Sequence, residues 1–449
     1  MAKLWDKGYK FDEQVERFTV WDDPQLDMNL VRWDCVGSIA QAKMLAKIGI
    51  LTAEEAERLR RALIEVVEMA EQGKFAIKQE EEDVHTAVEN FLVTKLGDIG
   101  KKLHTARSRN DQSALDMRLY MRDRIIATAD SLLKCAQTLV DFAQKHRDIP
   151  MPGRTHLQPA MPSSVGLWAG SFAESLLDDL EPLKASYVVA DQCPLGAAAS
   201  YGVSIPIDRQ MTSDLLGFAK VQNNVLYANN SRGKVEALVL SALMQIMMDL
   251  SKLSTDVQIF AMPEFGYFIL PSEFCGGSSL MPQKRNPGVF ELTRARGGTM
   301  LGLLVRAIDI VRTLPTGYNR DFQETKGAIM QGFDIAGSSL DVVARVMAGV
   351  QPDEQKMLAG FTPALFATDK VLELVLQGVP FRDAYRTVAA ELDKLQAPDP
   401  RENILKKTHL GAPGNLGLHL SVERLRREHA WLADSHSRWK KPIQALLGR

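Results

Sequence analysis

Cysteine is scarce in this sequence, and its placement excludes two kinds of structure. The 449 residues include 4 cysteines, Cys35, Cys135, Cys193 and Cys275, with no Cys-x-x-Cys pair and no histidine at metal-ligand spacing. Neither a disulfide framework nor a structural zinc site is therefore expected. The Cys275 thiol borders a glycine-rich loop, and we expect it to fill space rather than to react.

An excess of charge and a long apolar run are also lacking. Lysine and arginine number 54 against 56 aspartate and glutamate, so the formal net charge is −2. A general nucleic-acid binder would carry a basic excess, and no nucleic-acid partner is expected. We find no run of about 18 apolar residues, and the opening Met-Ala-Lys-Leu-Trp-Asp lacks the apolar core of a secretory signal. The sequence predicts a soluble, cytoplasmic protein without a membrane partner.

What the sequence does contain is a strong helical pattern. Residues 111–147 hold neither glycine nor proline and are rich in good helix formers. In residues 231–260, Leu238, Ala242 and Ile246 repeat at helical spacing on one face. Similar patterns cover residues 163–190, 288–314 and 325–350. Five long helices that carry small residues predict a tightly packed bundle.

The two ends of the chain differ from this central part. Residues 1–104 contain shorter helical patterns, one of them introduced by Thr52 and Glu55 at capping-box spacing. Residues 353–449 contain short segments punctuated by proline and glycine. We therefore expect two smaller helical domains, 1–104 and 353–449, flanking a central domain of residues 105–352.

The most distinctive string is the loop at 275–287, Cys-Gly-Gly-Ser-Ser-Leu-Met-Pro-Gln-Lys-Arg-Asn-Pro. Its paired glycines give backbone freedom at one end, while Asn286 and Pro287 are typical of the N-cap and first position of a helix. Hydroxyls, an amide, Lys284 and Arg285 lie between. The loop is interpreted as a catalytic lid, mobile at one end, that closes on an anionic substrate.

Three other polar strings accompany the loop. Residues 104–112 read His-Thr-Ala-Arg-Ser-Arg-Asn-Asp-Gln, at the start of a predicted helix whose N–H groups favour carboxylates. Residues 153–158 read Gly-Arg-Thr-His-Leu-Gln, between prolines that would hold His156 rigidly for acid–base chemistry. Residues 314–326 read Leu-Pro-Thr-Gly-Tyr-Asn-Arg-Asp-Phe-Gln-Glu-Thr-Lys.

Together these strings resemble the conserved blocks of the fumarase and aspartase superfamily, whose members break a C–N or C–O bond to release fumarate or a related acid. Gln283 and the Tyr-Asn-Arg-Asp-x-Gln-Glu-x-Lys order resemble the argininosuccinate lyase subgroup, which yields arginine and fumarate in arginine biosynthesis. The resemblance spans roughly residues 30 to 390. It implies an all-α, three-domain fold whose long-helix bundles join into the helical core of a homotetramer, with active sites shared between subunits. Neither a metal nor an organic cofactor is implied.

The resemblance also implies roles for individual residues. Ser278 matches the catalytic serine and His156 is the second proton-transfer group. Which of the two takes the proton stays open, with Ser278 preferred as base. Lys284 would help electrostatically. Asn110, Thr155 and Asn286 would hold the succinyl carboxylates, Arg109 would add forked donors, and Tyr318, Gln323 and Lys326 would bind the arginine-like half. For His85, a structural role and contact with substrate are equally open.

The sequence departs from the family pattern at several positions. Ala106 replaces the glycine that is usual in the family, and Arg154 stands where the family often has tyrosine. Residues 18–21, Phe-Thr-Val-Trp, replace a Phe-Asn-x-Ser segment with a substrate-binding serine, and residues 229–233 read Asn-Asn-Ser-Arg-Gly. Two alternatives stay open: a sister C–N lyase acting on another aminosuccinate adduct, and a non-catalytic scaffold. The joint presence of Ser278 and His156 with Lys284 and Asn286 argues against the scaffold.

Overall fold

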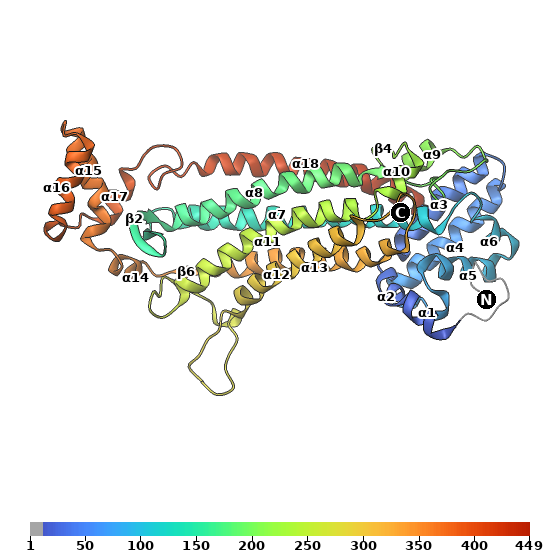
Figure 1. The fold of residues 1–449 in the computed structure, drawn as a ribbon, viewed down its shortest axis with the longest axis horizontal. Helices are drawn as coiled ribbons and strands as arrows, with labels where there is room; N and C mark the ends of the chain where they lie inside the picture. The colour runs from blue at the N-terminus through green and yellow to red at the C-terminus, as the bar shows by residue number, and fades with distance from the viewer. Residues whose placement is uncertain (1–11) are drawn as a thin grey trace.

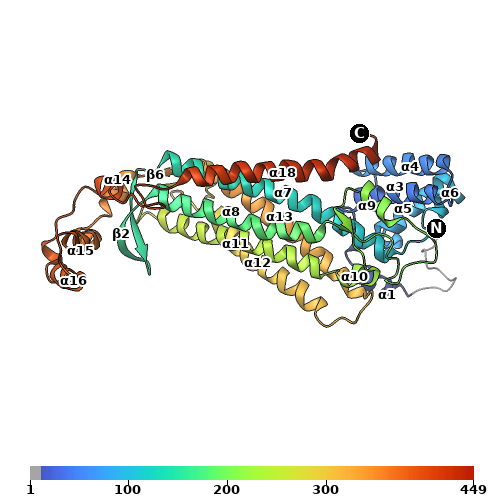
Figure 2. The same cartoon turned by 90° about the horizontal axis from the view of Figure 1, so that it is seen from above.

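The protein is an elongated rod in which a bundle of long helices separates two groups of shorter ones (Figures 1 and 2). This computed structural model describes residues 12–449. The sequence prediction about a secretory signal rests on the first six residues, which lie outside the described residues.

Six helices of 24 to 37 residues build the bundle, and the all-α prediction is confirmed. Five of them match the predicted ranges to within a few residues. The bundle comprises α7 (Arg109–Lys145), α8 (Val165–Ala190), α11 (Lys234–Ala261), α12 (Gly288–Val311), α13 (Gln323–Met347) and α18 (Leu418–Leu447).

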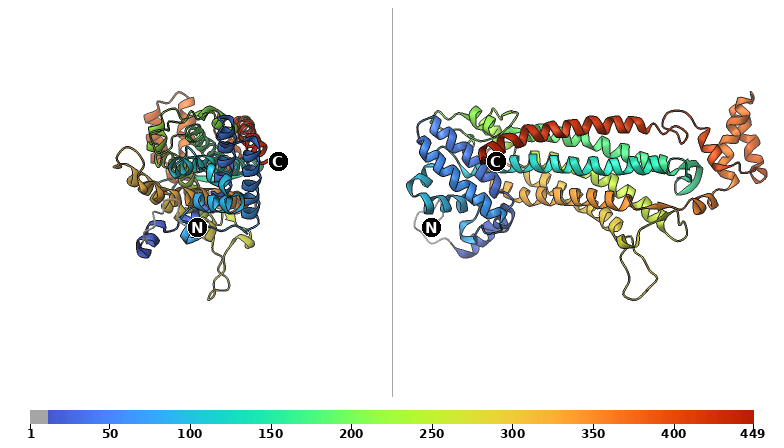
Figure 3. Two further views of the ribbon diagram at one scale, coloured as in Figure 1. Left: turned by 90° about the vertical axis from the view of Figure 1, so that its right-hand side faces the viewer. Right: turned by 180° about the vertical axis from the view of Figure 1, so that it is seen from behind.

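The helix α18 corrects the expectation that residues beyond 353 form only short segments. It runs for 30 residues and packs along α7, α8 and α3 (Val31–Lys47), ending beside the N-terminal helices. There Arg449 pairs with Glu71, and Figure 3 shows the two groups of short helices at opposite ends of the rod. The C-terminal part of the chain thus returns along the bundle, while the three-domain division itself stays a prediction.

Local signals explain where the central helix begins. Ser108 and Asp111 form a capping box: the Ser108 hydroxyl accepts from the Asn110 N–H at 3.2 Å, and the Asp111 carboxylate accepts from the Ser108 N–H at 2.9 Å. From that point α7 continues for 37 residues without a helix breaker. It therefore spans the full length of the bundle.

Close packing between bundle helices depends on small residues. A Cβ at Gly332 of α13 would lie 2.5 Å from the end of the Leu240 side chain of α11, so a larger residue here would force that side chain to move. Gly298 on α12, by contrast, faces open space, and Gly297 has only ordinary contacts. The glycine pair on α12 therefore does not serve packing within one chain.

One described helix, α11, has the length and mean hydropathy of a membrane span, with half of its apolar window buried. Its buried face, including Val239, Leu243 and Leu250, packs against α8, α12 and α13. The buried half of this apolar window therefore belongs to the core of the bundle.

The N-terminal group consists of short helices packed around α3. The predicted capping box is present: Glu55 accepts from the Thr52 N–H at 2.9 Å, and Thr52 accepts from the Glu55 N–H at 3.1 Å. The group contains α1 (Glu13–Val20), α2 (Asp23–Asp27), α3, α4 (Ala53–Glu71), η1 (Gln79–Glu81), α5 (Val84–Leu96) and α6 (Asp98–Lys102).

The remaining elements are short. At the end of the rod opposite the N-terminal helices lie α14 (Glu354–Ala359), η4 (Pro363–Phe366), α15 (Ala367–Leu376), α16 (Phe381–Ala390), η5 (Leu392–Lys394) and α17 (Pro400–Leu405). Strands pair two by two: β1 (Pro150–Thr155) with β2 (Gln158–Ser164), β3 (Gln192–Cys193) with β4 (Lys220–Val221), and β5 (Phe268–Ile269) with β6 (Gln351–Pro352). The connections hold α9 (Arg209–Leu215), α10 (Val225–Asn230), η2 (Ser272–Phe274) and η3 (Arg320–Phe322).

Candidate active site

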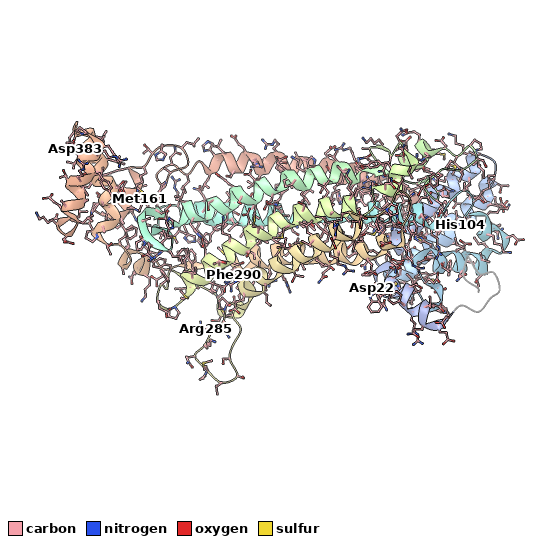
Figure 4. The ribbon with its side chains drawn as sticks, viewed as in Figure 1. Asp22, His104, Met161, Arg285, Phe290 and Asp383 are labelled. Carbon is pink, nitrogen blue, oxygen red and sulfur yellow. The ribbon has the colours of Figure 1, made fainter. Side chains whose placement is uncertain are left out.

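The residues predicted to form one site fall into three separate groups in the single chain. The first group lies at the N-terminal end of α7, the second on the projecting loop and the third on the β1–β2 hairpin. Figure 4 marks the three regions by Asp22, Arg285 and Met161. With 37 residues, α7 alone separates the first group from the hairpin by about 55 Å. The groups are Arg109, Asn110, Tyr318, Gln323 and Lys326; Ser278, Lys284 and Asn286; and Thr155 and His156.

The first group lines one cavity of about 210 Å³, so the structure brings all five of these predicted residues together. The cavity is rich in charge of both signs. Further lining residues had no assigned role in the sequence interpretation: Val20, Asp23, Asp27, Glu82, Asp83, Ser113, Arg232 and Arg320.

Lys326 is buried in this cavity and already has partners. Its ammonium group lies 2.7 Å from an Asp23 oxygen and also contacts Asp27. Burial alone would lower the pKa of Lys326, but the charges of Asp27 and Asp23 raise it above its ordinary value. Burial raises the pKa of Asp23 to about 6, although the charge of Lys326 opposes the rise. Lys326 is therefore positively charged, and hydrogen-bond donors of its ammonium group are already taken by Asp23 and Asp27.

The segment with the missing serine lies over the cavity. The Thr19 carbonyl accepts from the Gln323 amide at 3.1 Å and from the Arg320 guanidinium at 3.0 Å, and Val20 lines the wall. Backbone atoms of this segment thus hold Gln323. Asp23, from the residues that follow it, supplies a carboxylate to the cavity.

Arg109 is also paired within the chain. Its Nη1 donates to Asp83 at 2.8 Å and to Glu82 at 3.2 Å. Burial would lower the pKa of Arg109, but the two carboxylates raise it. The arginine and its partners form the wall beside Asn110, whose position in the first turn of α7 was predicted correctly.

Behind this wall, His85 is buried in an acidic cluster. Its Nδ1 lies 2.8 Å from Asp34 and 3.7 Å from Asp116. Burial alone would lower the pKa of His85, but the hydrogen bond and charge of Asp34 raise it to about 9. The imidazole is therefore a cation at neutral pH and lines the cavity from one side.

Among the described residues, the side chains of His85, Asp34 and Asp116 place possible metal-ligand atoms within 4.8 Å of one another, close enough to hold a metal ion. In the structure His85 donates to Asp34, so the cluster already balances charge as an ion pair. The prediction that no metal is involved stays a prediction.

Arg232 is one of the lining residues to which the sequence interpretation assigned no role. Its side chain is 8% exposed, and its Nη2 donates to the Ser113 hydroxyl at 3.0 Å. The guanidinium lies 5.5 Å from the Tyr318 ring and 5.4 Å from the Phe322 ring. The signal in the sequence was the departure at residues 229–233, which places this arginine just before a long helix.

The loop carrying Ser278 projects from the bundle between η2 and α12 (Figure 1). Gly276 and Asn286 exchange two backbone hydrogen bonds, of 2.9 and 2.8 Å, and the Asn286 amide donates to the Gly277 carbonyl at 3.1 Å. The helix begins at Gly288, after Pro287. The expectation that Asn286 caps α12 and that only one end of the loop is anchored is therefore wrong: the two ends are tied together.

Within the loop, the Ser278 hydroxyl faces two backbone donors. Its Oγ accepts from the Met281 N–H at 3.1 Å and from the Leu280 N–H at 3.3 Å. Such donors stabilise negative charge on the oxygen. Lys284 follows on the same loop, and the exposure of Leu280 and Lys284 leaves this surface open in a single chain.

Thr155 and His156 lie at the tip of the β1–β2 hairpin. His156 and Leu157 both have positive φ, 53° and 61°, so they form a two-residue turn of the type that normally uses glycine or asparagine. Arg154 donates to the Leu157 carbonyl at 2.9 Å and packs over the Phe265 ring at 4.7 Å. Arg154, noted as a departure, thus holds the turn that presents His156.

The family comparisons agree with these motifs. A family model described as lyase matches residues 9–302. The chain is 44% identical over 426 residues to the argininosuccinate lyase of Sorangium cellulosum, covering 95% of this chain and 99% of that protein. It is also 44% identical over 387 residues to the argininosuccinate lyase of Thermotoga neapolitana, covering 86% and 97%.

Solved structures share the fold at low sequence identity. An EDDS lyase in complex with formate superposes with a TM-score of 0.82 at 22% identity, covering 96% of this chain and 94% of that one. A class II fumarase from Schistosoma mansoni superposes with a TM-score of 0.73 at 15% identity, covering 99% and 97%. The predicted superfamily fold is thereby confirmed.

Proposed function

The chain belongs to the argininosuccinate lyase family, and on that premise we propose that it cleaves argininosuccinate reversibly to L-arginine and fumarate. The observation that carries the proposal is 44% identity over almost the whole chain, with both proton-transfer candidates present. The reaction is an elimination that breaks a carbon–nitrogen bond. It would serve arginine biosynthesis.

The chemistry needs a base, an anion-stabilising group and an acid. Removing the proton next to a carboxylate creates a dianion that requires nearby cations and N–H donors. We assign the base to Ser278, because two N–H groups already point at its oxygen. His156 would then protonate the departing guanidino nitrogen or orient the substrate. The reverse assignment of Ser278 and His156 is the other arrangement consistent with these residues.

The remaining residues would hold the two halves of the substrate. Asn110, Thr155 and Asn286 would take the succinyl carboxylates, and Lys284 would stabilise the charge that develops there. Tyr318 and its cavity would take the amino-acid half. No metal or organic cofactor is assigned to any of these steps.

Assembly into a homotetramer would bring the three groups together. A rod that separates the first group from the hairpin by about 55 Å cannot close one site by itself, but neighbouring rods packed side by side could. The outer face of α12 supports this packing, because Leu301, Val305 and Ile308 are about half exposed and Gly298 faces open space. We propose that this face contacts α12 or α11 of another subunit, and that the tetramer is cytoplasmic.

The test is direct turnover. Purified protein is mixed with argininosuccinate, fumarate is followed by its ultraviolet absorbance, and arginine is identified by mass spectrometry. The Ser278→Ala and His156→Asn variants are measured at several pH values beside the native protein. Loss of turnover in Ser278→Ala with retained tetramer supports the assignment of the base.

Two outcomes would contradict the proposal in different ways. Full turnover by Ser278→Ala would remove Ser278 from the mechanism but not change the reaction. No fumarate from a folded tetramer would point to a sister C–N lyase, and other aminosuccinate adducts would then be screened. The replaced serine segment, where Asp23 enters the cavity, is the feature that favours this alternative.

A further inference from the structure

A second cavity, of about 640 Å³, lies among the short helices at the end of the rod opposite the N-terminal helices. Its walls come from η4, α15, η5 and α17, and none of the residues assigned to the lyase reaction lines it. Its volume is within the range of about 300–1,000 Å³ that is typical of small-molecule sites.

Part of the cavity wall is apolar and open to a ligand. Leu372 and Leu376 of α15 are 45% and 89% exposed, and Leu395, which follows η5, lines the same wall. An aliphatic chain lying against these side chains would remove their apolar surface from water. The wall therefore suits a ligand with an apolar body.

Asn403 of α17 gives this cavity an unsatisfied acceptor. Its side chain is 7% exposed, and its Nδ2 donates to the Asp369 carboxylate at 3.0 Å. Its Oδ1 has no hydrogen-bond partner among the described residues. A buried acceptor in this state costs about 1–3 kcal/mol, which a ligand with an N–H donor would recover. Because the Asp369 carboxylate belongs to the same network, a positively charged donor is favoured over a neutral one.

The cavity also offers one unpaired ammonium group. Three of its four lysines pair with carboxylates of the same wall: Lys370 with Glu373 at 3.0 Å, Lys394 with Glu391 at 3.3 Å and Lys407 with Asp369 at 3.6 Å. The fourth, Lys406, has no carboxylate within ion-pair distance in the part of the chain that the structure describes. It is the C-cap residue of α17, three positions after Asn403. A negative group bound there would lie close to the unsatisfied acceptor.

We infer that this cavity binds a free α-amino acid with an aliphatic side chain. The carboxylate of the amino acid pairs with Lys406, its ammonium group donates to Asn403 Oδ1 beside Asp369, and its side chain covers Leu372 and Leu395. Each part of such a ligand meets a group that the chain leaves unsatisfied. The inference does not depend on the proposed lyase function.

The cavity is joined to the β1–β2 hairpin by Lys407. The ammonium group of this lysine donates to the Pro162 carbonyl of β2 at 3.0 Å and lies in the cavity wall. Figure 4 shows Met161, the residue before Pro162, beside the short helices. The same hairpin carries His156 at its tip. A ligand that orders Asp369 and Lys407 therefore also restrains the hairpin, so the cavity is an effector site.

The first experiment measures binding to the full-length protein by isothermal titration calorimetry. The probe is L-leucine, and the comparison ligands are 4-methylpentanoate, which lacks the ammonium group, and 3-methylbutylamine, which lacks the carboxylate. The native protein should bind leucine at least about 10-fold more tightly than either analogue, because each loses a charge-assisted hydrogen bond. Absence of leucine binding, or equal binding of all three ligands, would overturn the inference.

Two variants locate the binding at this cavity. Lys406→Met should lose the preference for leucine over 3-methylbutylamine, and Asn403→Leu should lose the preference for leucine over 4-methylpentanoate. Lys406→Met should keep the native unfolding temperature, because its ammonium group is exposed and unpaired. Lys74→Met, at an exposed position in the N-terminal part, is the matched control and should bind leucine as the native protein does. Native affinity for leucine in Lys406→Met would place the binding elsewhere and refute the inference.

Hydrogen exchange tests the link to the hairpin without using catalysis. Leucine should slow amide exchange in residues 150–164 of the native protein, as followed by mass spectrometry, and should have no effect there in Lys406→Met. In Lys407→Met, leucine should slow exchange around α17 but not in the hairpin. Leucine binding with unchanged exchange in the native hairpin would refute the effector role.

Discussion

Lys326 of α13 lies 2.7 Å from Asp23 of α2, in a buried ion pair that joins the bundle to the N-terminal helices across 303 residues of sequence. Asp27 contacts the same ammonium group. The lysine was expected to bind substrate, yet its position also makes it a structural link between two parts of the rod. The two roles can be separated by experiment.

Replacing Lys326 by methionine should destabilise the protein strongly. The change leaves Asp23 and Asp27 buried side by side without a cation, which costs about 3–5 kcal/mol when one partner of a buried ion pair is removed. The unfolding temperature should fall accordingly at fixed protein concentration. Lys74→Met, at an exposed position, is the control. Unchanged stability of Lys326→Met would show that the ion pair does not stabilise the fold.

His85 should make stability depend on pH in the alkaline range. Its pKa is about 9 in the folded protein and 6.5 in its ordinary state, so the imidazolium stabilises the fold fully below about pH 6.5. That contribution, about 3 kcal/mol, is lost as pH rises from 6.5 through 9.

The His85→Asn variant tests this pH dependence. It should be less stable than the native protein at pH 6 and should lose most of the decline between pH 6.5 and 9, as followed by thermal unfolding. His429→Gln, at an exposed position, should keep the native profile. A native decline that persists in His85→Asn would assign the titration to another group.

Ala106 stands in a backbone conformation that favours glycine, with a φ of 61°. Replacement by glycine, the usual residue of the family motif, should relieve about 1 kcal/mol of strain and raise the unfolding temperature. Ala53→Gly at the start of α4 is the opposite control and should lower stability. Destabilisation of Ala106→Gly would mean that the Ala106 methyl group makes favourable contacts that outweigh the strain.

Arg154 should act on catalysis through His156. Because Arg154 bonds to the Leu157 carbonyl and stacks on Phe265, Arg154→Ala should loosen the turn and lower kcat about 10-fold or more with little effect on KM. Adding Leu157→Gly, which favours positive φ, should restore part of the loss. A rise in KM alone, without rescue, would indicate direct contact between Arg154 and substrate.

The helices could be predicted because they depend on neighbouring residues, and the reaction type because four strings of the sequence resemble the conserved blocks of a known family. The capping boxes at Thr52 and Ser108 and the 3.6-residue periodicity of the bundle helices are local, and the structure confirms the helices they predict. The helix α18 escaped prediction, since Pro442 within it and the glycines before it are typical of short segments. Packing along α7 stabilises that helix, and sequence pattern does not report packing.

The sequence by itself determined the long helices of the bundle, because helix propensity and periodicity are local properties. Its serine-bearing loop and Thr-His string indicated a lyase through their resemblance to the conserved blocks of the family. The tertiary structure alone decided that the motifs lie in three separate groups, that Lys326 is paired with Asp23, and that the Asn403 amide oxygen is buried without a partner among the described residues. These facts arise from contacts between residues distant in sequence, whose burial and charge balance are set only when the helices pack.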